Sequence, residues 1–83
     1  PVAKALYKKE GFKVLMLAFK KGMILKEHKA HVPIKLFVLD GKVTYKSEAE
    51  EIKLDKFDKF EIPVNNLHAV YALEDSLCMV LQG

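Results

Sequence analysis

Short runs of apolar residues recur about every eight to twelve positions along the chain, separated by Gly, Asp, Asn and Pro. These separators favour turns, and short strands at this spacing are typical of a β-sandwich or barrel rather than of a helical protein. The pattern therefore predicts an all-β domain of about eight short strands.

Two of the expected strands are apolar at both alternating positions, and a strand of this kind is buried on both of its faces. They are Phe12–Phe19 and residues 34–39. For the first we expect a contact with another subunit on one face. Residues 42–46 instead alternate cleanly, with Val43 and Tyr45 on one face.

Residues 23–31 are compatible with two structures. In a helix, His28 and His31 would lie three residues apart on one face, and Pro33 would end the helix. The β-rich surroundings favour a strand.

The length of 83 residues, 51% of them hydrophobic, predicts one globular domain that spans residues 1–83. So small a barrel buries little apolar surface and leaves a sheet face open. We therefore expect a homodimer in which the second subunit covers one sheet.

The charge is unevenly distributed. Residues 1–46 hold 11 lysines and three acids, whereas residues 47–83 hold three lysines and eight acids. A basic half would suit nucleic acid, but the chain has no arginine for bidentate contacts to phosphate, and its aromatic residues are not interleaved with the lysines. We therefore expect a lysine-coated surface and no nucleic-acid partner.

The single cysteine, Cys78, excludes an internal disulfide. It lies between Leu77 and Met79 in an expected strand, which predicts a buried thiol rather than a nucleophile. The apolar run 14–19 is too short to cross a bilayer, and no signal peptide is recognisable. We expect a cytoplasmic protein with no membrane contact.

Residues 22–41 carry a spaced pattern that resembles the first motif of the cupins. That motif is a Gly, five residues, His-x-His, three or four residues, a Glu, six residues and a Gly. The matching residues are Gly22, His28 and Gly41. Ala30 stands at the second His position, with His31 one residue beyond, and Ile34 stands at the Glu position.

A second stretch resembles the other cupin motif, which is a Gly, five residues, Pro-x-Gly, two residues and a His. Pro63 and His68 match. Phe57 and Asn65 replace the two glycines, and for Asn65 the change is mild because Asn tolerates the left-handed region. The resemblance implies a small antiparallel, jelly-roll type cupin β-barrel.

Cupins with intact motifs hold a divalent metal through three histidines and one glutamate. By this resemblance the metal ligands would be His28 and His68, together with His31 if a bulge between Lys29 and Val32 shifts the strand by one residue. The candidate metals are Zn, Mn, Fe and Ni. The protein would then be a metal-dependent enzyme with oxygenase- or isomerase-like chemistry.

The replacement of the glutamate by Ile34 favours a different hypothesis, because two histidines alone seldom hold a metal tightly. Without metal, His28, His31 and His68 would form a pocket that hydrogen-bonds a small polar or anionic molecule. Lys26 or Lys35 would add charge at the rim. A third hypothesis is an interaction domain that uses the two-faced strand Phe12–Phe19. The direction of the His31 side chain depends on one residue of strand register.

Overall fold

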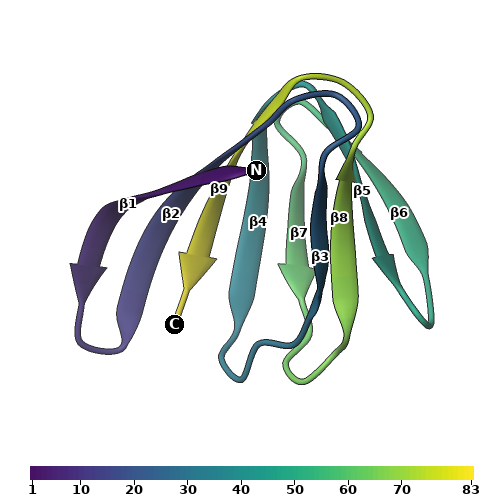
Figure 1. Ribbon diagram of the computed structural model, residues 1–83. Coiled ribbons are helices and arrows are strands. Elements are labelled where there is room, and N and C mark those ends of the chain that lie inside the picture. Colours follow the sequence, from purple (N-terminus) through teal and green to yellow (C-terminus); the bar gives the residue numbers. More distant parts are fainter.

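The computed structural model describes the backbone of residues 1–83 and every side chain except those of Glu27 and His28. Nine strands form two antiparallel sheets (Figure 1). The first sheet has the order β1 (Val2–Lys9), β2 (Phe12–Phe19), β9 (Ser76–Gln82), β4 (Ile34–Asp40), β7 (Lys59–Ile62). The second has the order β3 (Ile24–His28), β8 (His68–Ala72), β5 (Lys42–Ser47), β6 (Glu51–Asp55).

The all-β prediction is confirmed, with one strand more than the expected eight. Residues 24–28 form a strand, so the helical alternative for this segment is wrong. In the described part of the chain, no helix has the length and apolar character needed to cross a membrane.

The chain passes from one sheet to the other at every connection except the β1–β2 and β5–β6 hairpins. In Figure 1 the five-stranded sheet lies to the left, with β1 at its outer edge, and the four-stranded sheet lies to the right. The inner wall of each sheet is therefore assembled from residues that are far apart in the sequence.

The core lies between the two sheets and follows the period-two pattern of the strands. On β4, Ile34, Leu36 and Val38 are buried, whereas Lys35 between them is exposed. The second sheet contributes Tyr45, which is fully buried and packs its ring 4.5 Å from that of Phe60.

The turn that joins β4 to β5 has room only for glycine. Gly41 has φ +85°, and a Cβ built there would overlap the backbone oxygen of Asp75 and lie 2.7 Å from the Cα of Ser76. The expected Asp-Gly turn is therefore present, and its glycine is required by both conformation and space.

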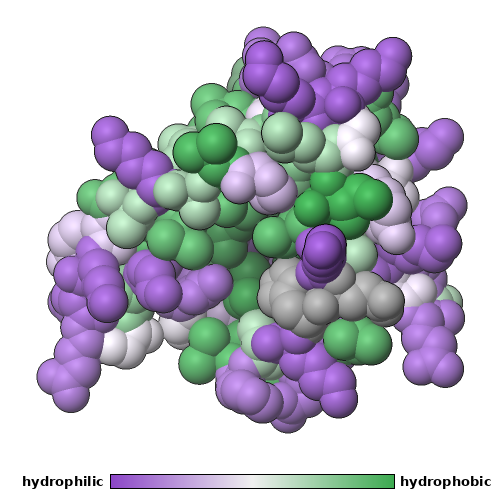
Figure 2. Space-filling view, in the orientation of Figure 1, coloured by the Kyte–Doolittle hydropathy of each residue, from purple (hydrophilic) through white to green (hydrophobic). Residues whose placement is uncertain are grey.

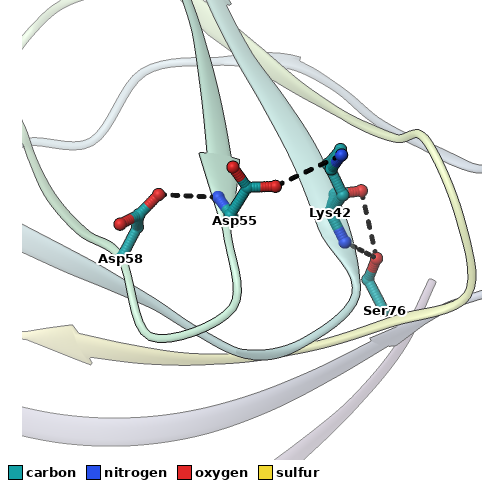
Figure 3. Close-up of polar contacts among 4 residues, drawn as sticks. All are labelled: Lys42, Asp55, Asp58 and Ser76. Carbon is teal, nitrogen blue, oxygen red and sulfur yellow. Dashed lines mark hydrogen bonds and ion pairs between the residues drawn. The ribbon is translucent and has the colours of Figure 1, made fainter.

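Ser76 fastens this turn to the start of β9. Its buried hydroxyl accepts a hydrogen bond from the backbone N–H of Lys42 at 3.0 Å (Figure 3). The hydroxyl hydrogen can be donated to the carbonyl oxygen of Glu74, 2.7 Å away. Ser76 thereby satisfies a backbone donor at a crossover between the two sheets.

Asp58 closes the turn between β6 and β7. Its carboxylate accepts the backbone N–H of Asp55 at 2.7 Å, as Figure 3 shows. The nearby ion pair of Lys42 with Asp55, at 3.4 Å, is exposed to solvent and adds little stability.

Candidate functional site

A cavity of about 240 Å³ lies between the two sheets. Its described wall is mainly aliphatic, and the space-filling view shows a hollow surrounded by hydrophobic residues (Figure 2). The wall includes Leu15, Leu17, Leu36, Ile62, Val70 and Val80. Two polar side chains interrupt it, those of His68 on β8 and Gln82 at the end of β9.

His68 lies at the cavity wall in a fixed orientation and is only 1% exposed. Its Nδ1 lies 2.9 Å from the backbone oxygen of Asn66. Because a carbonyl oxygen can only accept, Nδ1 donates, and the lone pair of the neutral ring is then at Nε2. The ring also stacks on Tyr45 with a centroid distance of 5.5 Å.

Asn66 holds both of these aromatic groups in place. Its side-chain N–H donates to the hydroxyl of Tyr45 at 3.2 Å, while its backbone carbonyl oxygen accepts a hydrogen bond from Nδ1 of His68. The loop between β7 and β8 therefore sets both the position and the tautomer of the cavity histidine.

His31 lies beyond the end of β3, is exposed, and is not part of the cavity wall. Its Nδ1 is 2.9 Å from Oδ1 of Asn65, and the backbone N–H of Asn65 donates to the carbonyl of Ala30 at 2.8 Å. These contacts tie the β3–β4 loop to the β7–β8 loop.

The ladder of β3 with β8 shifts its register between Leu25 and His28. The recruitment of His31 to the site depended on a bulge between Lys29 and Val32, and these residues lie beyond the end of β3. The backbones of His28 and His68 are direct partners in this ladder. The prediction for the His28 side chain falls outside the described residues.

Ile34 stands at the position of the family glutamate, and its side chain is buried and lines the cavity. It supplies a hydrocarbon surface where a metal site needs a carboxylate. Among the side chains that the structure describes, no three His, Cys, Asp or Glu come together to hold a metal ion. The expected three-histidine site includes His28, whose side chain lies outside the described residues, so this site stays a prediction.

The lysines expected at the rim, Lys26 and Lys35, are exposed and are not part of the cavity wall. Gln82 was not predicted from the sequence as a site residue. The available signal was the alternation along β9, because Gln82 continues the inward series of Cys78 and Val80.

The two motifs match the structure in their backbone conformation. Residues at the glycine positions have positive φ: Gly22 at 87°, Gly41 at 85°, Phe57 at 74° and Asn65 at 57°. A left-handed conformation is ordinary for Asn but strained for an aromatic residue. The turns of the motifs are therefore retained even where the glycine is not.

The comparisons with known proteins identify the fold. No family sequence profile matches the chain, and no curated protein matches its sequence. Among solved structures, a cupin superfamily protein from Desulfitobacterium hafniense has a TM-score of 0.93 and 16% identity over 98% of this chain and 74% of that one. An RmlC-like cupin from Desulfovibrio desulfuricans has a TM-score of 0.89 and 22% identity over 99% and 80%.

KdgF from a Halomonas species is also similar, with a TM-score of 0.86 and 24% identity over 96% of this chain and 76% of its own length. At these identities the structural similarity shows the fold but does not indicate a reaction. The all-β architecture of two antiparallel sheets agrees with it. The protein is a small domain with the cupin fold.

Proposed function

We propose that this cupin domain binds a small, mainly apolar molecule with one or two polar groups in the cavity between its sheets. The observation that carries the proposal is the composition of the wall: among the side chains that the structure describes there, all are aliphatic except those of His68 and Gln82. Apolar pockets with few polar groups are typical of small-molecule sites, where the polar groups orient the ligand.

The size of the cavity limits the ligand. Because a cavity of about 150 Å³ holds benzene, one of about 240 Å³ accommodates roughly ten non-hydrogen atoms. The aliphatic wall favours an apolar ligand over the polar or anionic one that the histidines alone suggested, since a charged group would lose its hydration there.

Phenol and toluene are suitable probes because they have the same size and differ in one hydroxyl group. We expect both to shift the amide resonances of cavity residues in an NMR titration, with millimolar or tighter affinity, and phenol to bind more tightly. The His68→Phe variant keeps an aromatic ring and should lose the preference for phenol. Val80→Phe fills the cavity and should weaken both probes.

A matched control is Thr44→Val, because Thr44 is buried but is not part of the cavity wall. It should leave both affinities unchanged. If neither probe perturbs the cavity resonances of the wild-type protein at saturating concentration, the proposal is wrong.

A metal-binding function is the second candidate, and the backbone pairing of His28 with His68 is the observation in its favour. Elemental mass spectrometry of untagged protein, before and after addition of Zn, Mn, Fe or Ni, separates the two. About one metal per chain, lost in His68→Ala, would support this candidate. A ratio near zero after loading would exclude it.

A further inference from the structure

The inner side of the five-stranded sheet changes from apolar to basic at the end where the β1–β2 hairpin lies. Partners in an antiparallel ladder project from the same face. One row of partners on this face is apolar and consists of Ala5, Leu15, Val80 and Leu36. The next row on the same face consists of Lys8, Lys13, Gln82 and Ile34. Two lysines and a glutamine therefore continue the aliphatic wall of the cavity.

A bulge in β1 brings Lys8 to this inner side. The register with β2 shifts between Ala5 and Tyr7, so that Lys8 rather than Tyr7 follows Ala5 on the inner face. Bulges re-aim side chains and are common beside functional sites. The result here is that Lys8 stands directly opposite Lys13. Like charges in this arrangement are unfavourable to stability.

Lys8 and Lys13 have no acidic partner among the side chains that the structure describes. The ion pairs in this part of the chain involve other lysines, namely Lys42, Lys46 and Lys56. Lys8 is exposed and Lys13 is half-buried, so both ammonium groups are accessible to a ligand. An anion bound between them would relieve their repulsion and accept their hydrogen bonds.

A surface pocket of about 220 Å³ lies at the same end of the sheet. Its wall includes Lys8, Lys13 and Gln82, with Val32 from the loop between β3 and β4. Gln82 lines both this pocket and the cavity between the sheets, and Lys13 lies about 6.6 Å along β2 from Leu15 of the cavity wall. In Figure 2, hydrophilic side chains gather at the lower left, on the side of the β1–β2 hairpin, and border the hydrophobic hollow. One small molecule can therefore occupy both spaces.

We propose, on the basis of the ligand-binding function above, that the ligand is an amphipathic anion. It is a small monocarboxylate whose apolar chain fills the cavity and whose carboxylate lies between Lys8 and Lys13. The carboxylate stays outside the aliphatic wall, so it keeps part of its hydration and avoids the cost of burial there. Its two oxygens accept hydrogen bonds from the two ammonium groups.

Hexanoate and 1-hexanol test the charge of the ligand, because they share one alkyl chain and differ in the head group. Both should shift the amide resonances of cavity residues in an NMR titration at pH 7. Lys8→Gln combined with Lys13→Gln should weaken hexanoate about fivefold, as expected for two exposed ion pairs, and leave 1-hexanol unchanged. The matched control is Lys4→Gln, which removes the same charge from the other side of β1, where Lys4 pairs with Met16. This control should leave both affinities unchanged.

The salt dependence of binding is a second measurement, and it needs no variant. Raising NaCl from about 20 mM to about 500 mM should weaken hexanoate at least about twofold in the wild-type protein, because salt screens exposed charges, and should not weaken 1-hexanol. A hexanoate affinity that is insensitive to salt, or equal in the wild type and the double variant, would overturn the carboxylate site. The ligand-binding function would still stand if 1-hexanol shifted the cavity resonances. If neither molecule shifted them, both proposals would be wrong.

Discussion

The thiol of Cys78 offers a quantitative test of the packing between the sheets. Cys78 is fully buried on β9, with Leu17 and Val38 as its neighbours in the ladders on either side. Burial disfavours the thiolate and raises the pKa of Cys78 from its ordinary value of 9.0 to about 11. Because the unfolded chain exposes the same thiol, the difference in pKa becomes a dependence of stability on pH.

The sign follows from the order in which the two states lose the proton. The unfolded thiol ionises near pH 9.0 and the folded one near pH 11. The contribution to stability is therefore fully present below pH 9.0 and is lost as the pH rises towards 11. Between pH 8 and pH 10 these two pKa values correspond to a loss of about 1.3 kcal/mol in the free energy of unfolding.

Urea unfolding at pH 8 and pH 10 measures this loss, with a reducing agent present and at one protein concentration. The comparison is between the wild-type protein and Cys78→Ala, because the variant keeps every other ionisable group and their effects cancel. The variant should be less stable at pH 8 because it leaves a small void. Its deficit should shrink by about 1.3 kcal/mol at pH 10. An equal deficit at both pH values would refute the reasoning.

Three further predictions concern stability, measured by urea unfolding at pH 7 unless stated. Gly41→Ala should cost about 2 kcal/mol or more, through the positive φ and the overlap with Asp75; an unchanged midpoint would contradict the turn geometry. Ser76→Ala should cost about 1–3 kcal/mol because the N–H of Lys42 loses its acceptor, whereas Ser76→Thr, which keeps the hydroxyl, should cost less. Ile34→Glu should cost about 3 kcal/mol or more because it buries an unpaired carboxylate. Protonation should restore part of this loss near pH 4, and equal loss at both pH values would argue against burial.

The sequence alone determined the local features of this protein. The rhythm of apolar runs and turn residues was enough for an all-β fold, and the spacing of Gly22, Gly41, Pro63 and His68 was enough for the resemblance to cupins. Both are local, because strand period and turn conformation depend on residues close together in the chain. The sequence also showed that Phe12–Phe19 is apolar on both faces, because the alternation of side chains along a strand depends on that strand alone.

The composition of the cavity was decided only by the tertiary structure. Its wall combines residues from separate strands of both sheets, and a shift of one residue in register would turn any strand's inward set outward. The register shift in β3 between Leu25 and His28 is such an effect. Sequence reasoning grouped three histidines by motif, whereas the described structure places His68 in an aliphatic wall and His31 at the surface.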